Sequence, residues 1–531
     1  MSSRAQFHAR IALAVFALLV GVLIPKSASA GASDDAVTAA RALRAWQFDE
    51  ARQLIKALVT KRPKSKTSRY LQAELDFLDG NYQQVIAGLA GLDDDSIDGN
   101  VGSLRDLAAS SYQATSGFAS EVSSGGHFKI FYAPGKDKTI VGLTGDVLEA
   151  AYEALGSDLG HRPTHQIRVE LLGKASDLAM VSTLTEAEIG TTGTIALCKY
   201  GKLMVVSPRA TVLGYPWMDT LTHEYVHYIV TQISHDNVPV WLHEGLARYL
   251  QVRWREKADG KLDHSSEHLL VTALKKDTLI PFDKMHPSMA KLPSQDAAAL
   301  AFAEVSTMVA YIHTSVGDAG LQRALTSIRD GMGARKAVAQ AMDTEWNDLE
   351  RDWIRHLKSL KLQSKPFAER GQKVRFRKGK GEADNVGVDV IADKRVRKYA
   401  RLAGMLRIHG RTAAAAVEYQ KALAAGGADD PLIIAKLSRI YLELGRYREA
   451  IALAEPLLAL NEMDALPPTT VGAAKLALGD HLGAVAAFDL ALRISPFDMR
   501  IRCGLAESYE QLKHKAASRE RQACEYLQQV R

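Results

Sequence analysis

The chain has 531 residues, of which 67 are basic and 61 acidic, so its formal net charge at pH 7 is +6. This near-neutral balance lacks the strong positive charge with which proteins bind phosphate backbones, so we expect no nucleic-acid partner. The length leaves room for several domains, each able to bury a core of its own.

Residues 1–30 have the composition of a secretory signal peptide. Arg4 and Arg10 precede an apolar run from Ile11 to Ile24, and Ala28-Ser29-Ala30 forms a small-x-small cleavage site. The apolar run is shorter than the roughly 20 residues that cross a bilayer, so we expect cleavage and no stable membrane span afterwards. We therefore expect an exported protein, periplasmic or extracellular and bacterial. An uncleaved anchor is the alternative.

Residues 31–120 are predicted to form an N-terminal helical region that contains a repeat. Phe48 and Tyr82 lie 34 positions apart, and three positions later each is followed by a small or branched apolar residue, Ala51 and Val85. A period of about 34 residues is typical of tetratricopeptide repeats, which pair two antiparallel helices. A plain helical bundle is the alternative, because few of the consensus positions are filled.

Residues 121–364 mix strand and helix patterns, which predicts a small α+β domain. Apolar and polar residues alternate from His127 to Tyr132, as in a strand, and a hairpin is predicted from Gly193 to Ser207. Pro216 to Ile233 follows with an apolar background and no internal Pro or Gly, which indicates a buried helix. The chain as a whole is predicted to be mostly helical around this domain.

The sequence His223-Glu224-Tyr225-Val226-His227 lies within that buried helix. Residues i and i+4 of a helix share one face, so His223 and His227 can present two imidazole nitrogens to one cation. Catalytic zinc takes three protein ligands and leaves one position open for water. Glu244, 17 positions after His227, is well placed to be the third ligand. We predict one Zn²⁺ ion; a solvated pair of histidines is the alternative.

The chemistry predicted from this site is metal-assisted hydrolysis. Zinc lowers the pKa of a bound water and polarises the scissile carbonyl. Glu224 is the catalytic residue in this scheme, because it takes the proton of the water as general base and passes it to the leaving amine. Asp219, one helical turn before His223, is a candidate for orienting that histidine.

The two motifs together resemble the gluzincins of the peptidase MA-like group. The resemblance is carried by His223-Glu224-x-x-His227 and by Trp241-Leu242-x-Glu244-Gly245-x-Ala247, and it extends over residues 127–360. It implies a zincin-like α+β fold and a zinc metallopeptidase acting on peptides or proteins. It also implies His223, His227 and Glu244 as zinc ligands and Glu224 as base. In this family the sheet edge at the 193–207 hairpin holds the substrate backbone.

The sequence departs from related zinc aminopeptidases in two ways. Their Tyr-Glu-Lys-Gly context, whose tyrosine stabilises the tetrahedral intermediate, is matched here only by Phe302–Val305, and a phenyl ring cannot donate a hydrogen bond. Tyr311, Tyr249, His235 and His243 are candidates for this role, with a core or surface position as the alternative. The Gly-x-Met-Glu-Asn stretch that holds a free amine is absent, so we expect an endopeptidase.

Residues 365–392 are predicted to form a basic, Gly-containing linker. The stretch from Arg370 to Gly381 is rich in Lys, Arg and Gly. A solvated linker is the commoner meaning of such a composition, and contact with an anionic surface is the alternative.

Residues 393–531 show a clearer tetratricopeptide period. The glycines Gly410, Gly445 and Gly479 fall 35 and 34 positions apart, and an alanine follows each of them five positions later. Leu505 to Val530 would form a fourth, capping unit. We expect the array to dock substrate or partner proteins, with a purely structural buttress as the alternative.

The cysteines are consistent with export. Cys503 and Cys524 lie at similar heights on the two antiparallel helices predicted for the last unit, on either side of a turn near His514. An exported protein could keep a disulfide between them, and two buried thiols are the alternative. Cys198, in the predicted hairpin, has no zinc-ligand spacing and is expected in the core.

A different class of function competes with the peptidase. The chain would then be a non-catalytic periplasmic tetratricopeptide scaffold with a structural zinc domain. The presence of Glu224 argues against this alternative, because a structural site has no use for a general base and fills all four ligand positions. The missing tyrosine supports it.

Overall fold

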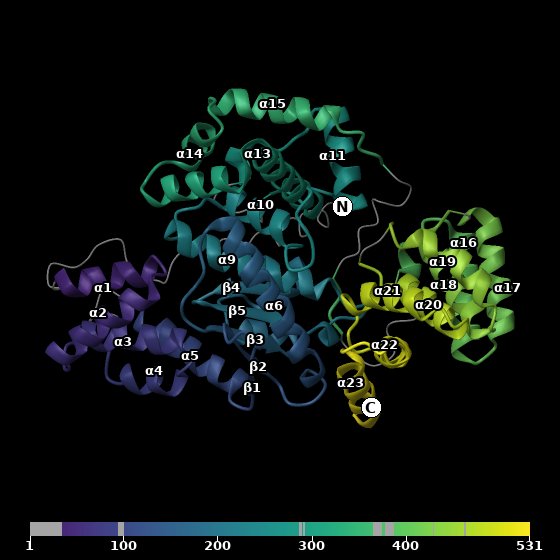
Figure 1. Cartoon of the computed structure of the whole chain (residues 1–531), viewed down its shortest axis with the longest axis horizontal. Helices are drawn as coiled ribbons and strands as arrows, with labels where there is room; N and C mark the ends of the chain where they lie inside the picture. The colour runs from purple at the N-terminus through teal and green to yellow at the C-terminus, as the bar shows by residue number, and fades with distance from the viewer. Residues whose placement is uncertain are drawn as a thin grey trace, which may run out of the picture.

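The computed structural model describes residues 34–93, 100–285, 289, 292–364, 374–377, 387–427, 429–460 and 463–530. The predicted signal peptide and most of the predicted linker lie outside these residues. Along the chain follow an N-terminal helical region, a central part with a sheet, and a C-terminal array of helices (Figure 1).

The N-terminal region consists of helices that pack as antiparallel pairs. Two of the turns that reverse the chain hold Trp46 and Gly80 at positive φ, and these residues are again 34 positions apart. Phe48 and Tyr82, two residues later, are both buried. The backbone therefore repeats with the period predicted from the sequence. The helices are α1 (Asp34–Arg44), α2 (Phe48–Lys61), α3 (Lys66–Leu78), α4 (Tyr82–Gly88) and α5 (Val101–Thr115).

The central part contains a five-stranded sheet in the order β1-β2-β3-β5-β4. The three inner strands β2, β3 and β5 run parallel, and both outer strands are antiparallel to their neighbours. The predicted hairpin is β4 followed by β5, so β4 forms one edge of the sheet. The strands are β1 (Ala119–Val122), β2 (Phe128–Tyr132), β3 (Ile167–Leu172), β4 (Ala196–Lys199) and β5 (Lys202–Val206).

Helices cover both faces of this sheet, as the strand sequences require. Successive side chains of a strand point to opposite faces, and in β5 both sets are apolar and buried. Leu203 and Val205 join the core with α6 (Lys138–Leu159) and α9 (Trp217–Ser234). Met204 and Val206 pack on the opposite side with residues of α7 (Ala175–Met180) and α8 (Glu186–Thr192). An α+β layer was predicted, and the structure has one.

A group of helices completes the central part beyond α9. α10 packs between α9 and the long helix α13, in which Gly317 interrupts the helical backbone. Among the described residues, Asp296–Arg329 is long and apolar enough to cross a membrane. Half of its most apolar 18-residue stretch is buried inside the protein. The helices are α10 (Val240–Leu250), α11 (His264–Lys276), α12 (Phe282–Met285), α13 (Gln295–Arg329), α14 (Ala334–Ala341) and α15 (Trp346–Ser359).

The C-terminal array is built from four helical hairpins. Gly410, Gly445 and Gly479 have φ values of 71°, 73° and 80° in the turns of the first three hairpins, and Lys513 takes the same left-handed conformation in the fourth. The turns predicted from the glycine spacing are therefore confirmed. The helices are α16 (Lys394–Ile408), α17 (Thr412–Ala422), α18 (Pro431–Glu443), α19 (Tyr447–Ala454), α20 (Leu466–Ala477), α21 (His481–Leu492), α22 (Met499–Gln511) and α23 (Ala517–Gln529).

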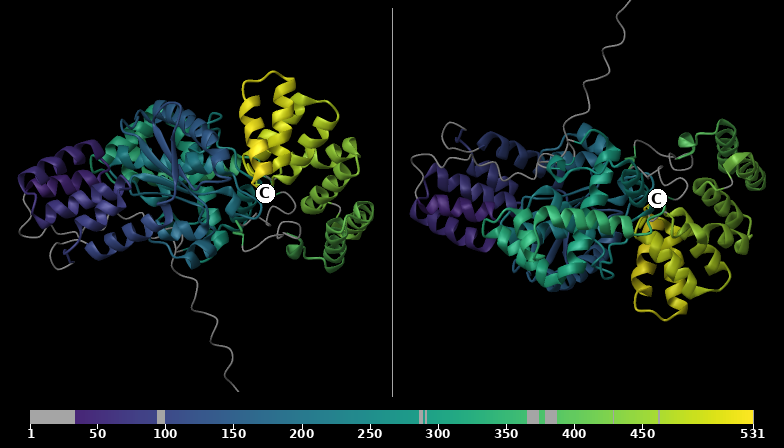
Figure 2. Two further views of the ribbon diagram at one scale, coloured as in Figure 1. Left: turned by 90° about the horizontal axis from the view of Figure 1, so that it is seen from below. Right: turned by 90° about the horizontal axis from the view of Figure 1, so that it is seen from above.

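The last two hairpins are joined to the central part (Figure 2), where Phe488 and Leu505 belong to its hydrophobic core. The Trp217 side chain, at the start of α9, donates from Nε1 to the Leu492 carbonyl oxygen over 3.1 Å. Arg502 is buried, pairs with Glu520 at 2.6 Å, and also donates to the Thr139 carbonyl. The array is therefore fixed against the helix that carries the His-Glu-x-x-His motif.

Two further segments show how the sequence predictions stand. Cys503 and Cys524 form a disulfide between α22 and α23, with their Cα atoms 4.9 Å apart, so the structure has the first of the two predicted alternatives. Residues 374–377 of the predicted linker lie against the central part. Phe376 forms an antiparallel β-bridge with Thr211 and packs on the apolar cluster that contains Met204 and Val206.

Candidate metal centre

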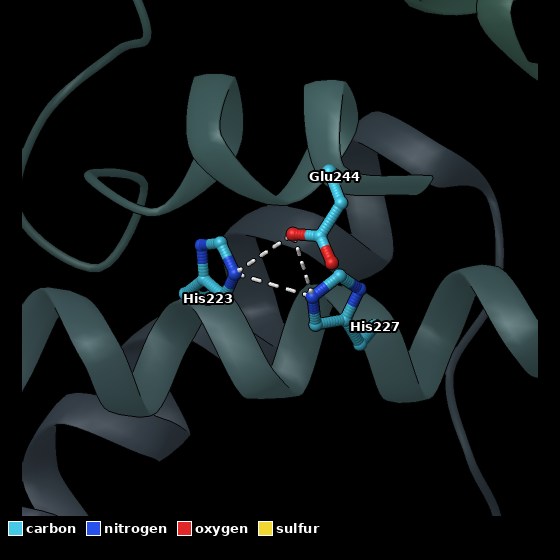
Figure 3. Close-up of side chains that lie close together, drawn as sticks. All are labelled: His223, His227 and Glu244. Atoms are coloured by element: carbon cyan, nitrogen blue, oxygen red, sulfur yellow. Dashed lines mark hydrogen bonds and ion pairs between the residues drawn. The ribbon is translucent and has the colours of Figure 1, made fainter. Parts of the chain in front are cut away.

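Two neighbouring helices carry the predicted metal ligands (Figure 3). α9 provides His223 and His227 from successive turns of one face, and α10 provides Glu244 from its N-terminal half. Gly245 follows directly and allows α10 to approach α13 closely, because a Cβ there would lie 2.8 Å from the Val305 carbonyl oxygen. The glycine of the second motif is thus required by helix packing.

The three side chains converge on one point. The Nε2 atoms of His223 and His227 are 3.1 Å apart, and Glu244 Oε2 lies 3.6 Å from the first and 3.5 Å from the second. Within the described part of the chain, this is the group of His, Cys, Asp or Glu side chains whose ligand atoms are close enough to hold a metal ion. Two imidazole nitrogens and one carboxylate oxygen are the donor set of a catalytic zinc site.

The electrostatics of the triad favour a positive charge at its centre. Burial alone would raise the pKa of Glu244, but the adjacent His227 and His223 outweigh this and hold it well below its usual range. Burial likewise opposes protonation of His227, yet the Glu244 charge outweighs it and raises the pKa of this imidazole. Glu244 is thus a buried carboxylate that requires a cationic partner.

Glu224 stands beside the triad rather than within it. Its side chain is buried, which raises the pKa of its carboxyl group. The backbone N–H of Cys198, on the edge strand β4, lies near this carboxyl group and lowers its pKa in part. The carboxylate is therefore held between the edge of the sheet and the histidines, a place suited to proton transfer.

His223 is oriented by a residue that the sequence analysis missed. Its Nδ1 lies 3.3 Å from Gln251 Oε1, so the Nδ1–H donates to the amide and Nε2 is left with its lone pair towards the metal position. Gln251 lies seven residues after Glu244, two turns along the same helix face, and this spacing is the signal that could have found it.

Asp219 does not have the orienting role predicted for it. Its Oδ1 accepts a hydrogen bond from Trp254 Nε1 over 2.6 Å, and Arg255 lies 3.3 Å from Oδ2. The helical spacing of four residues from His223 was read correctly, but the segment after α10 supplies closer partners for the carboxylate.

His227 is backed by a second histidine. Its ring stacks on His243, with the centroids 4.4 Å apart, and the Nε2 of His243 lies 3.2 Å from Thr231 Oγ1. Burial, together with the neighbouring His227, lowers the pKa of His243 well below its usual value, so this imidazole is neutral. His243 therefore packs against the His227 ring as a neutral side chain.

The described contacts of the other candidates for stabilising the tetrahedral intermediate are with residues outside the triad. The Tyr249 hydroxyl bonds to His313 Nδ1 at 2.8 Å and also donates to the Ala258 carbonyl. The ring of Tyr311 packs near His356, and His235 takes a left-handed conformation at the end of α9. The structure thus assigns this role to none of the four candidates among the described residues.

Comparison with known proteins supports a peptidase. Residues 149–359 match the model of the Peptidase MA superfamily, a range that contains the triad and Glu224 and covers about two fifths of the chain. The prediction of a peptidase MA-like group is therefore confirmed for the central part. A search of curated proteins found no match.

Solved structures that match include hydrolases from yeast. One is yeast LTA4 hydrolase in complex with bestatin, with 11% identity, coverage of 77% of this chain and 67% of that chain, and a TM-score of 0.28. Another is native leukotriene A4 hydrolase from Saccharomyces cerevisiae, with 12% identity, coverage of 78% and 67%, and a TM-score of 0.30.

Proposed function

We propose that the protein is an exported zinc-dependent metallopeptidase of the gluzincin type, acting on peptide or protein substrates. The observation that carries the proposal is the convergence of His223, His227 and Glu244 beside a buried Glu224 that faces the sheet edge. The superfamily match over the same residues supports the reaction class.

Each residue of the site has a distinct role in this proposal. His223, His227 and Glu244 would hold the zinc ion, and Gln251 fixes the tautomer of His223. When bound, zinc supplies Lewis acidity that polarises the scissile carbonyl and acidifies the attacking water. The Glu224 carboxylate accepts the proton of that water and then donates it to the nitrogen of the leaving amine.

The edge strand β4 supports an extended polypeptide as the substrate. One edge of β4 pairs with β5. The backbone N–H of Cys198 in β4 lies near the carboxyl group of Glu224, which places β4 next to the triad. A chain that adds to a sheet edge binds through its backbone and brings an internal peptide bond to the site. Together with the missing amine-binding motif, this favours an endopeptidase. The helical hairpins, as tetratricopeptide repeats, would dock substrate or partner proteins.

The alternative is a non-catalytic scaffold with a structural zinc domain. The observation in its favour is that the described contacts of Tyr249, Tyr311 and His235 are with residues outside the triad. In that case the zinc would stabilise the joint between α9 and α10 without turnover.

One experiment separates the two functions. Wild type, Glu224→Gln and the control Glu304→Gln are purified in parallel, and zinc content and cleavage of unfolded casein are measured with and without chelator. Glu304 is a buried glutamate of α13 that bonds to the Ile280 backbone, so its substitution leaves the site intact.

We expect one zinc in all three proteins and cleavage by wild type and Glu304→Gln only, with Glu224→Gln slower by roughly 10²-fold or more. Equal cleavage by Glu224→Gln would disprove its role as base. One zinc without cleavage in any protein would favour the scaffold.

A further inference from the structure

The first helix of the C-terminal array, α16, has a charge unlike that of the rest of the chain. Its sequence from Lys394 to Ile408 contains six basic residues and no acidic one, whereas the whole chain of 531 residues has a net charge of only +6. Arg401 forms an ion pair with Asp389 and Arg407 with Glu443. Arg395 and Arg397 lie near Asp393. A strong local excess of positive charge remains.

The same helix exposes large apolar side chains. Leu402, Met405 and Ile408 are 38%, 50% and 55% exposed, while Val396 and Ala400 on the opposite face are buried against the next helices of the array. Terminal helices of repeat arrays normally carry a polar outer face. An exposed apolar set at such an end indicates an interaction site.

The charged and apolar residues share one face. Lys394, Lys398 and Leu402 follow one another at intervals of four residues. Met405 and Ile408 follow at intervals of three, so all these side chains lie along one side of the helix. The basic residues occupy its first half and the apolar residues its second. We define the outer face of α16 as Lys394, Lys398, Arg401, Leu402, Met405 and Ile408. In Figure 2 the array extends from α20–α23 beside the central part to α16 and α17 at its other end.

We infer that the outer face of α16 binds the surface of an anionic phospholipid membrane. Lysine and arginine attract acidic headgroups, and leucine, methionine and isoleucine enter the boundary between headgroups and acyl chains, as in helices that lie in the membrane interface. A membrane also needs no shaped groove, which a single helix face does not offer.

The composition of the face disfavours other occupants. A second copy of the chain would bring lysines against lysines in a parallel pairing, or lysines against the apolar half in an antiparallel one, and both arrangements are unfavourable. Nucleic acid uses the positive charge but leaves Met405 and Ile408 in water, since its contacts are dominated by phosphate.

Vesicle co-sedimentation with the full-length protein tests the inference. The probes are vesicles of one part phosphatidylglycerol to two parts phosphatidylcholine, and vesicles of phosphatidylcholine alone. The variants are Lys394→Gln/Lys398→Gln, Met405→Gln/Ile408→Gln and the control Leu482→Gln. Leu482 is 71% exposed on α21 of the same array, but it follows Asp480 and His481 instead of a basic stretch.

We expect wild type and Leu482→Gln to bind the anionic vesicles equally, and to be released when the salt concentration is raised. The double lysine variant should bind roughly 20-fold more weakly, since each basic side chain near an anionic surface contributes about fivefold. The double apolar variant should bind up to roughly tenfold more weakly than wild type.

Three results would overturn the inference. The first is a lack of dependence on the face, seen either as equal binding of wild type to neutral and anionic vesicles or as binding of both double variants to anionic vesicles at the wild-type level. The second is a wild-type dimer that Met405→Gln/Ile408→Gln turns into a monomer, which would assign the face to a second copy. The third is binding of poly-glutamate without binding of anionic vesicles, which would assign it to an acidic protein.

Discussion

The substitution Gly214→Ala tests whether the C-terminal array holds the start of α9 in place. Gly214 has a φ of 80°, and a Cβ at this position would lie 2.1 Å from the Ile494 carbonyl oxygen. Directly after it, Tyr215 N–H donates to that same oxygen over 3.2 Å, and Trp217 N–H donates to the Arg493 carbonyl. The added methyl group must therefore push residues 493–494 away from α9.

The expected loss has two parts. A residue with a side chain in the left-handed region costs roughly 1–2 kcal/mol relative to glycine. Displacement of the loop also weakens the two backbone hydrogen bonds and the bond from Trp217 Nε1 to Leu492, each worth about 1 kcal/mol. We expect the free energy of unfolding to fall by about 3–5 kcal/mol.

Gly479→Ala is the matched control, because Gly479 has the same φ of 80° and nothing within 4 Å of the position of its missing Cβ. It should lose only the roughly 1–2 kcal/mol of backbone strain. Urea unfolding followed by circular dichroism, with zinc content measured on the same samples, compares the two variants. Equal losses in both would refute the conclusion that contact with Ile494 matters.

Three more substitutions test other parts of the structure. Gln251→Leu removes the acceptor for His223 Nδ1 and should weaken zinc affinity by roughly 10–100-fold, measured by competition with a chromophoric chelator; unchanged affinity would exclude an orienting role. Lys202→Met removes the ammonium group 3.2 Å from the buried Glu170 but leaves Arg168 paired with it at 2.6 Å, so the free energy of unfolding in urea should fall by less than the roughly 3–5 kcal/mol of an uncompensated buried charge; an unchanged free energy would exclude a stabilising role for this ion pair. Burial raises the pKa of Glu304 from 4.5 to about 8, so the folded protein binds an extra proton between these values and wild type loses stability as pH rises through this range. Glu304→Gln does not titrate, and its free energy of unfolding should fall less than that of wild type between pH 5 and 8, by at most about 4 kcal/mol; parallel pH profiles would contradict the assignment.

Local patterns were sufficient to predict much of the site. The spacing alone places His223 and His227 on one helix face. The prediction of Glu244 as their neighbour required only that a second helix lie next to the first. The neighbours of these three side chains were harder to predict, because packing between separate helices and loops decides which residues meet them. Asp219 was expected at His223 and instead bonds to Trp254, while Gln251 takes the expected place.

The sequence by itself determined the shared helix face of His223 and His227, the helical hairpins and their turns, because helix periodicity and turn glycines act over a few residues. Only the tertiary structure decided that the array and the central part share a core. Trp217 and Leu492 are 275 positions apart, and no local pattern encodes a hydrogen bond over that separation. Such contacts depend on how apolar faces fit together once the helices have formed.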